Sequence, residues 1–397
     1  MSLGIYISVP FCRTKCSYCN FASDVFSRSV FERYVDRVCA EIAGAAAVAV
    51  ELGAHIDRDV DSIYLGGGTP TVLEAAQLRR IFAEVRRTFS VCPKAEITVE
   101  CAPGTLTPAL LDSLLVCGVN RVSLGVQSFI DAEAASVGRL HKRTTVLDDI
   151  ARLRAAGITN INVDLIAGLP HQTAQSWQES LGGTIATGVP HVSVYMLEVD
   201  EDSRLGRELI AGGTRYHAHF VPSEDDTADS YVADCESLEA AGVAQYEISN
   251  FARPGCESRH NLKYWTRQPY LGFGVDAHSM LPATDPAAEA VRFSTADSLE
   301  QYMAGAALHK TVVTRALAFE ERFFLGLRLN RGVDLRQIAA DFGQAAVQSV
   351  QASIDELQSD GLLVQDGSFL RLTARGRLLS NEVFQRFIAP ADCSTAL

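Results

Sequence analysis

Three cysteines close to the amino terminus have the residue type and the spacing of a metal-binding group. Cys12, Cys16 and Cys19 lie within eight residues, whereas the other seven of the ten cysteines are scattered along the chain and are expected to be ordinary thiols. Structural zinc needs four ligands and usually takes a second cysteine pair, which this sequence lacks. Three thiolates in one short loop suit a [4Fe–4S] cluster that keeps one iron open for chemistry.

Glycines and polar residues elsewhere could surround a ligand at that open iron. The run Gly66-Gly67-Gly68-Thr69-Pro70 can bring bare backbone close to a ligand, although a tight strand-to-helix turn is the alternative interpretation of such a run. Glu100, Gln127 and Asp164 each end an expected strand and offer donors and acceptors for hydroxyl groups and for a positive charge. Arg139 could meet a carboxylate, and ordinary capping or ion-pair roles remain open for all four.

Six short apolar runs, each followed by a helical pattern, must position these side chains. The expected strands span residues 5–9, 62–65, 96–100, 121–126, 160–166 and 191–197. This alternation predicts parallel strands with right-handed crossovers, and hence an α/β fold of the partial (β/α)6 barrel type. Because such barrels carry their chemistry at the carboxyl ends of the strands, the cysteines, the glycine run and the polar strand ends are predicted to share one rim.

The strand–helix repeat stops near residue 200, and the sequence predicts three parts. Residues 1–200 form the barrel, residues 201–311 a flanking region with a lid and an aromatic-rich loop, and residues 312–397 a mostly helical, winged-helix-like domain. Asp366-Gly367 between two apolar runs predicts a β-hairpin in the last part. Winged helices often bind DNA, but residues 312–388 hold nine arginines and nine acidic residues, so we expect packing or partner contact instead.

Composition sets the broad class of protein. The chain has 397 residues, of which 47% are apolar and 21% charged, a globular composition that can bury a full core. Thirty-five Lys and Arg against 48 Asp and Glu give a formal charge of −13, which disfavours nucleic acid as a partner. Because the sequence shows neither a run of about 18 apolar residues nor a signal peptide, we expect a cytoplasmic protein that does not span a membrane.

The cysteine motif resembles that of a known superfamily. C-x3-C-x2-C after a first strand, with the aromatic Tyr18 before the last cysteine, is similar to the radical S-adenosylmethionine (SAM) superfamily. The resemblance implies that the open iron chelates the amino and carboxylate groups of SAM, and that an electron from the cluster splits the sulfonium bond to give a 5′-deoxyadenosyl radical. Matched motif by motif, it implies a SAM site lined by Tyr6, Tyr18, Gly67, Gly68, Thr69, Glu100, Gln127, Arg139 and Asp164.

Longer segments carry a closer resemblance. They are YISVPFC at 6–12, GGGTP at 66–70, VECAP at 99–103, SLGVQSF at 123–129 and DLIAGLP at 164–170. These segments resemble the oxygen-independent coproporphyrinogen III oxidase-like family, which includes both the oxidases and a heme-chaperone branch, HemW. Two features favour the chaperone branch: Phe21 stands where the oxidases carry a fourth cysteine, and the long amino-terminal extension of the oxidases is missing before the first strand.

A third feature is the segment His260-Asn261-Leu262-Lys263-Tyr264-Trp265. It matches the H-N-x-x-Y-W motif that is associated with heme in the chaperone branch. A histidine beside two aromatic residues offers an imidazole for iron and faces for a porphyrin, while a structural histidine with packed aromatics is the alternative. His260 is therefore the first heme candidate, and His278 is the second.

Three functions follow as hypotheses. The first is a heme chaperone that binds heme, a [4Fe–4S] cluster and SAM and delivers heme to apo-hemoproteins, including membrane-associated proteins of the respiratory chain. The second is an oxygen-independent oxidase that decarboxylates the propionates of coproporphyrinogen III to vinyl groups. The third is a radical SAM enzyme acting on RNA, which the winged-helix-like part suggests and the negative charge opposes.

Overall fold

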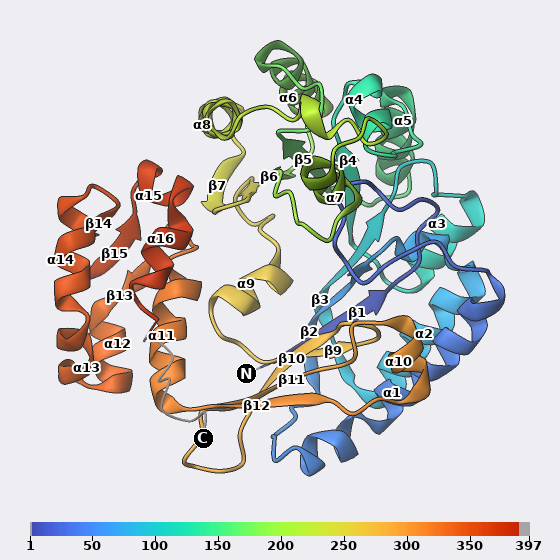
Figure 1. The fold of residues 1–397 in the computed structure, drawn as a ribbon. Helices are drawn as coiled ribbons and strands as arrows, with labels where there is room; N and C mark the ends of the chain where they lie inside the picture. Colours follow the sequence, from blue (N-terminus) through green and yellow to red (C-terminus); the bar gives the residue numbers. More distant parts are fainter. Residues whose placement is uncertain (1, 389–397) are drawn as a thin grey trace.

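The computed structural model describes residues 2–388, apart from the side chain of Asp234, and its first half contains the expected six parallel strands. Their bounds are β1 (Leu3–Val9), β2 (Asp59–Gly67), β3 (Ser90–Cys101), β4 (Arg121–Gln127), β5 (Asn160–Ala167) and β6 (His191–Met196). Between them run α1 (Ser29–Glu51), η1 (Pro70–Val72), α2 (Ala75–Thr88), α3 (Pro108–Val116), α4 (Asp131–Ser136), α5 (Arg143–Ala155) and α6 (Ala174–Thr187). The strands are neighbours in chain order, and the helices cover their outer face (Figure 1), which confirms the partial (β/α)6 barrel.

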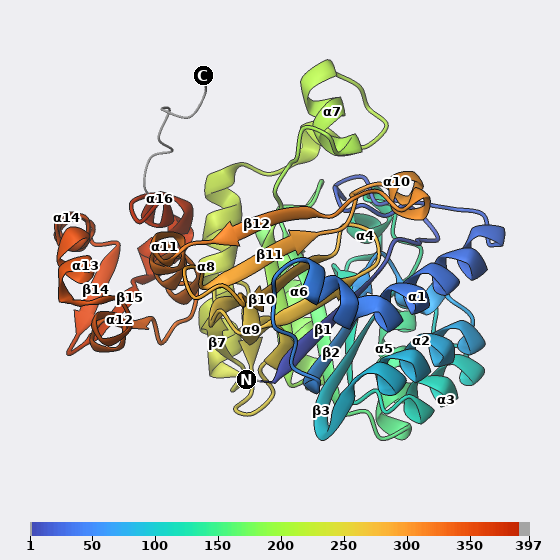
Figure 2. The ribbon, with the colours of Figure 1, turned by 90° about the horizontal axis from the view of Figure 1, so that it is seen from below.

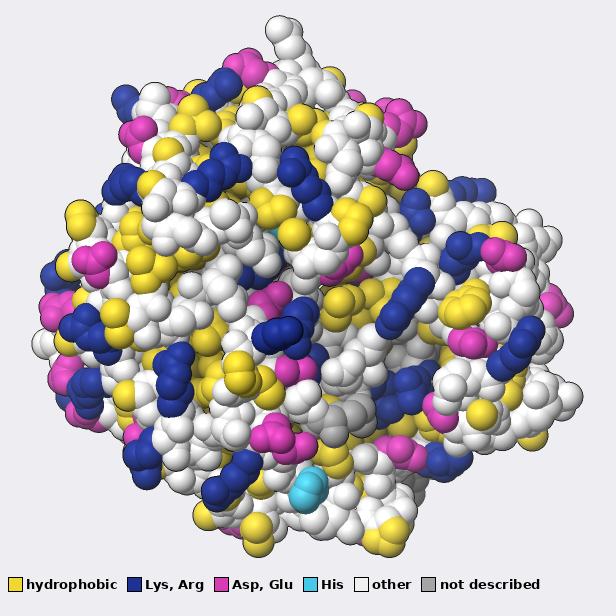
Figure 3. Space-filling view, turned by 180° about the vertical axis from the view of Figure 1, so that it is seen from behind, with side chains coloured by type: hydrophobic (Ala, Val, Ile, Leu, Met, Phe, Trp, Pro, Cys, Tyr) yellow, Lys and Arg dark blue, Asp and Glu magenta, His cyan; other side chains and the backbone are white. Residues whose placement is uncertain are grey.

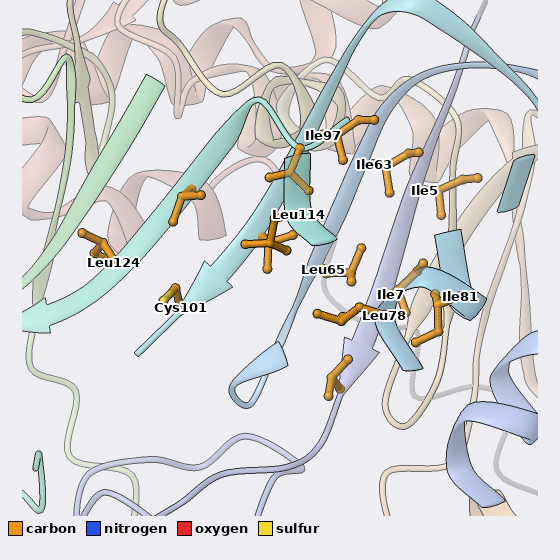
Figure 4. Close-up of a cluster of buried hydrophobic side chains, with 14 of the residues drawn as sticks. Ile5, Ile7, Ile63, Leu65, Leu78, Ile81, Ile97, Cys101, Leu114 and Leu124 are labelled. Atoms are coloured by element: carbon orange, nitrogen blue, oxygen red, sulfur yellow. The ribbon is translucent and has the colours of Figure 1, made fainter. Parts of the chain in front are cut away.

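Alternation along the strands explains how the barrel forms. The apolar residues Ile5, Ile7, Ile63 and Leu65 lie in one buried cluster with side chains of α2 and α3, as the close-up in Figure 4 shows. Successive strand residues point to opposite faces, so the residues between these point inward. Many inward positions are polar, and Ser62, Thr98, Ser123, Asn162 and Ser193 are all buried. The barrel interior is therefore a polar chamber behind an apolar outer layer.

The sheet continues on both sides of the six parallel strands, which the sequence did not predict. Its full order is β12-β11-β10-β9-β1-β2-β3-β4-β5-β6-β8-β7, and it does not close on itself. The added strands are β7 (Ala244–Glu247), β8 (Asn250–Ala252), β9 (Tyr270–Phe273), β10 (His278–Pro282), β11 (Ala290–Ser294) and β12 (His309–Val313). The flanking region is thus part of the barrel sheet. The predicted aromatic-rich loop is wrong, since its H-N-x-x-Y-W segment forms helix α9 (Arg259–Trp265).

The segment that the sequence predicts to be a lid contacts the cysteine loop. It consists of α7 (Arg204–Ala211), η2 (Ala218–Phe220) and the start of α8 (Glu224–Ala240), which Ser223 caps. The Leu205 amide donates to the carbonyl of Ser17 at 2.8 Å, and Arg204 Nη1 donates to the carbonyl of Lys15 at 3.2 Å. Helix α7 therefore contacts the segment that holds the three cysteines.

The carboxyl-terminal domain has its own core. After α10 (Leu299–Ala304) and β12, the helices α11 (Arg315–Gly326), α12 (Leu335–Phe342), α13 (Gln344–Ser349), α14 (Gln351–Ser359), α15 (Ala374–Leu378) and α16 (Ser380–Gln385) surround the small sheet β13-β15-β14. In that sheet, β13 (Val333–Asp334) precedes the predicted hairpin of β14 (Leu363–Asp366) and β15 (Phe369–Leu372). Figures 1 and 2 show this domain beside the barrel. The end of the predicted domain, residues 389–397, lies outside the described residues.

Buried charges join the domain to the barrel. Glu321 on α11 has no exposed surface and pairs with Arg267 at 2.7 Å and Arg292 at 2.6 Å, two residues of the barrel side. Arg328 lies over the ring of Trp265, the last residue of α9, at 4.5 Å from its centroid. Helix α9 therefore contacts both the barrel interior and the carboxyl-terminal domain.

The surface carries both signs of charge close together. Figure 3 shows acidic and basic side chains interspersed with apolar ones over one face of the molecule, without a basic stripe. Among the described residues, none of the helices is both long enough and apolar enough to cross a membrane.

Candidate functional site

The cysteine loop is a closed structure at the carboxyl end of β1. Its two ends pair, because the Cys12 amide donates to the carbonyl of Asp24 and the Asp24 amide donates to that of Pro10, both at 3.0 Å. Lys15 Nζ closes the loop further by donating to the carbonyls of Phe21 and Ser23 at 2.7 and 2.5 Å. The sequence places three thiols in this loop, and these backbone contacts keep them on one rim of the barrel.

The thiols have the chemistry of cluster ligands. Cys12 Sγ accepts a hydrogen bond from Thr69 Oγ1 at 3.8 Å, and the Cys19 amide donates to the carbonyl of Cys16 at 3.3 Å. Burial raises the pKa of the Cys12 thiol, and the hydrogen bond from Thr69 acts in the opposite direction. All nine described cysteines are free thiols. Three soft donors and no fourth thiol in the loop fit an iron–sulfur cluster with one open iron.

The three cysteine side chains of the loop do not converge on a common metal position. Within residues 2–388, no three His, Cys, Asp or Glu side chains are placed to hold one metal ion. The case for the cluster therefore comes from the set of donors and from the loop that carries them.

The glycine run packs tightly against the end of β1. A Cβ on Gly68 would lie 2.8 Å from the carbonyl oxygens of Val9 and Phe11, and Gly67 has a φ of 98°. The amides of Gly68 and Thr69 donate to those same two carbonyls at 2.8 Å. The turn explanation thus accounts for the glycines, and these two N–H groups are used within the protein. Of the backbone groups in this run, only the carbonyl oxygens can accept a hydrogen bond from an ammonium group.

Two half-buried carboxylates lie inside the barrel, and Glu100 lies beside Gly66 of the glycine run. Glu100 Oε1 accepts from the hydroxyl of Tyr64 at 2.9 Å, and Asp164 accepts from Ser123 at 3.0 Å and from Asn162 at 2.7 Å. Burial, with the nearby charge of Asp164, raises the pKa of Glu100 to about 7. Burial also raises the pKa of Asp164. Glu100 can therefore gain or lose a proton near neutral pH.

The remaining predicted SAM residues gather on the same rim. Arg139 Nη2 donates to the hydroxyl of Tyr18 at 2.9 Å, and its Nε is buried without a partner among the described residues. A Cβ on Gly125 would lie 3.2 Å from Gln127 Nε2 and 3.4 Å from Arg139 Nη2, so these two side chains lie side by side. Gln127 has the unusual φ of 70° for a residue with a Cβ. The structure thus brings the polar residues and the cysteine loop together.

His260 lies apart from this rim. Its Nδ1 shares a hydrogen bond with Ser62 Oγ at 3.0 Å and its Nε2 one with the hydroxyl of Tyr264 at 2.8 Å, and only 1% of the residue is exposed. Burial, together with the charge of Lys263, lowers the pKa of His260 to about 3. The ring lies close to Gly4 at the start of β1, about 16 Å below the end of that strand. Both imidazole nitrogens are therefore occupied at the amino-terminal floor of the barrel.

Sequence reasoning missed the side chains that orient the predicted ones. Tyr64 holds Glu100, while Ser123 and Asn162 hold Asp164. Tyr64 also packs against Tyr6, one of the predicted residues, with ring centroids 6.1 Å apart. The signal that could have found them is the strand alternation, because each lies an even number of residues from a predicted ligand or glycine on its strand.

Fold and site together define a radical SAM protein. Residues 6–182 match the radical SAM superfamily, and residues 313–379 match the HemN C-terminal domain. The solved structure of coproporphyrinogen III oxidase (HemN) from Escherichia coli is similar, with a TM-score of 0.82 and 25% identity over 97% of this chain and 90% of that one.

Comparison with known relatives identifies the family to which the chain belongs within this superfamily. The chain is 34% identical to the heme chaperone HemW of Bacillus subtilis over 390 residues, which are 96% of this chain and 98% of that protein. It is 32% identical to the HemW of Mycobacterium tuberculosis, over 97% of this chain and 94% of the relative. The chain belongs to the HemW family.

Proposed function

We propose that this protein is a cytoplasmic heme chaperone, which binds heme, a [4Fe–4S] cluster and SAM and passes heme to apo-hemoproteins. The observation that carries the proposal is the full-length similarity to proteins named heme chaperones. The cysteine loop supports it, since Phe21 stands where the oxidase branch is expected to carry a fourth cysteine.

Different residues at the rim would hold the cluster and SAM. Cys12, Cys16 and Cys19 would hold the cluster, which supplies an open iron for SAM and an electron for cleavage of its sulfonium bond. Carbonyl oxygens of the glycine run would accept from the ammonium group of SAM. Arg139 would then meet the SAM carboxylate, since its guanidinium Nε has no partner among the described residues.

The carboxylates inside the barrel would bind the sugar and the charge of SAM. Ionised Glu100 accepts hydrogen bonds from ribose hydroxyls and favours a nearby sulfonium. Asp164 is held in place by Ser123 and Asn162, so its orientation is fixed before SAM enters. Tyr6, Tyr18 and Gln127 would complete the wall of the site.

The proposed partners are respiratory and other hemoproteins, which would receive heme from this protein. The names of the relatives support the heme-chaperone part of the proposal alone. The proposed cytoplasmic location is compatible with the free thiols of the described cysteines, since thiols persist in a reducing compartment.

An oxygen-independent coproporphyrinogen III oxidase is the second candidate, because the similar solved structure is such an enzyme. A product assay separates the two functions. The full chain is reconstituted anaerobically and incubated with SAM, reductant and coproporphyrinogen III. We expect no vinyl products, and a stoichiometric Soret band when the same protein is titrated with heme. Vinyl products would overturn the chaperone proposal, and so would the lack of a saturable Soret change in protein that carries its cluster.

A further inference from the structure

A cavity opens between the cysteine loop and the added strands β9 and β10. It has a volume of about 250 Å³, and its lining includes Tyr6, Phe21, Gly67, Tyr264, Tyr270 and His278. We refer to this cavity as the mouth pocket. Two of its lining residues, Tyr6 and Gly67, are also among the residues assigned to SAM, so the mouth pocket adjoins the proposed SAM site.

His278 is the one histidine that lines this cavity. Its side chain is 60% exposed, and across residues 2–388 neither ring nitrogen makes a hydrogen bond. The nearest charged group is Asp276, whose Oδ1 lies 3.6 Å from His278 Nε2. This is the opposite of His260, whose two nitrogens are both occupied. An imidazole can bind iron only through a free nitrogen, and His278 has free nitrogens to offer.

The backbone beneath His278 is held firmly. The Ala277 amide donates to Thr295 Oγ1 at 2.9 Å, and the Asp276 amide donates to the carbonyl of Ala296 at 2.8 Å. A Cβ on Gly272 would lie 2.3 Å from the carbonyl oxygen of His278, so β9 passes directly against it. A free imidazole on a fixed backbone needs little ordering when it binds a ligand.

Aromatic side chains provide faces for a flat macrocycle. Phe21 on the cysteine loop is 64% exposed, although burial of such a large apolar side chain is favourable. Tyr264 and Tyr270 meet edge to face with centroids 4.6 Å apart. The cavity is smaller than the ~300–1,000 Å³ of sites that enclose a drug-sized ligand, so a porphyrin would lie across its opening and stay partly exposed. An exposed edge suits a ligand that is handed on.

We propose that His278 is the axial ligand of heme, with the macrocycle across the mouth pocket against Phe21 and Tyr270. The inference rests on the proposed heme-chaperone function and names its site. His260 then acts as a positioning residue, because it holds Tyr264, which lines the same pocket. Since heme and SAM would share Tyr6 and Gly67, each changes the affinity for the other by the same factor.

The test is a heme titration of the full chain, followed at the Soret band and by electron paramagnetic resonance. We expect His278→Ala to weaken heme binding at least tenfold and to change the ligand-field spectrum, with added imidazole restoring the spectrum of His278→Gly. His55→Ala, at an exposed histidine near Pro282 at the far end of the same strand, is the matched control. His260→Ala is expected to keep the wild-type spectrum with a smaller loss of affinity, and Phe21→Ala to weaken binding several-fold.

The outcomes separate the inference from the function on which it rests. Wild-type protein that binds no heme would refute the proposed function. Wild-type protein that binds heme, together with a His278→Ala variant of unchanged affinity and spectrum, would overturn the His278 assignment alone. A spectrum lost only in His260→Ala would move the ligand to His260. An unchanged heme affinity at saturating SAM would contradict the inference that the heme and SAM sites share Tyr6 and Gly67.

Discussion

The two ends of the barrel use the same kinds of residue in different ways. At the floor, His260 is buried and both of its nitrogens are hydrogen-bonded, while Glu96 accepts from the amides of Arg259 and His260 at 3.1 Å. At the rim, His278 is exposed and Arg139 has a buried nitrogen without a partner among the described residues. A polar group whose bonds are all made stabilises the fold, whereas one with bonds still to make can bind a ligand.

The largest expected effect tests the rim. Replacement of Cys12, Cys16 or Cys19 by alanine should abolish the iron–sulfur absorbance after anaerobic reconstitution, because each removes one of only three thiolates in the loop. Cys39→Ala is the control, since Cys39 lies half-buried on α1 away from the loop, and it should keep the absorbance. Full cluster assembly in any of the three loop variants would refute the assignment of that residue.

The second prediction tests the floor. His260→Ala should lower the free energy of unfolding by roughly 2–4 kcal/mol, because it leaves a cavity and two polar groups without their partner. Denaturant titration measures this change. Ser62→Ala removes only one of the two hydrogen bonds and should cost about 1 kcal/mol. An unchanged stability in His260→Ala would mean that the floor is not held by this residue, and the contrast between the two ends would fail.

The third prediction concerns the proton on Glu100, whose pKa is raised to about 7 by burial and by Asp164. The ionised form is the one expected to bind SAM, so binding is full above pH 7 and is lost as the pH falls through that value. Between pH 8 and pH 6 we expect SAM affinity to fall by about tenfold, in step with the ionised fraction. Calorimetric titration of cluster-loaded protein measures it. Glu100→Gln should bind weakly with no such slope, and an equal slope in that variant would assign it to another group.

The smallest expected effect lies where the floor meets the carboxyl-terminal domain. Arg328→Ala removes the cation over Trp265 and should lower the free energy of unfolding by about 1 kcal/mol. Arg386→Ala, which breaks the exposed pair of Arg386 with Glu356, is the control and should change stability by less than about 0.5 kcal/mol. Equal losses of stability in the two variants would show that the contact of Arg328 with Trp265 stabilises the fold no more than an exposed ion pair does.

The sequence predicted the parts that depend on local pattern. The six parallel strands and the hairpin around Asp366-Gly367 follow from periodicity and turn chemistry, and the structure confirms them. The strands β9 to β12 were missed because they are short and lie among glycines and prolines. The pairing of β9 with β1, to which the other three are joined in turn, depends on residues far apart in the sequence. The helix at His260 was taken as a loop because its seven residues are too few for a helical period to stand out.

The sequence predicted which residue types gather at the rim. It could not predict which of their polar atoms are already hydrogen-bonded within the protein. Spacing alone placed Cys12, Glu100 and Asp164 on one rim. Which histidine has a free nitrogen depends on contacts such as Ser62 with His260, separated by 198 residues. The hydrogen bond that the Gly68 amide donates to the Val9 carbonyl could not be predicted from the sequence either, because it arises from the register of β1 and β2.

The pairing of Glu321 with Arg267 and Arg292 has a consequence for how this chain can be dissected. A fragment that ends before α11 would keep both arginines and lose the carboxylate between them. It would also uncover the apolar side chains of Met280, Ala290 and Val313, which pack with Ala318 of α11, and exposing such a patch to water is unfavourable. The barrel is therefore not a module that can be excised intact. Loss of heme transfer in such a truncated protein would report a damaged barrel sheet rather than a missing docking surface.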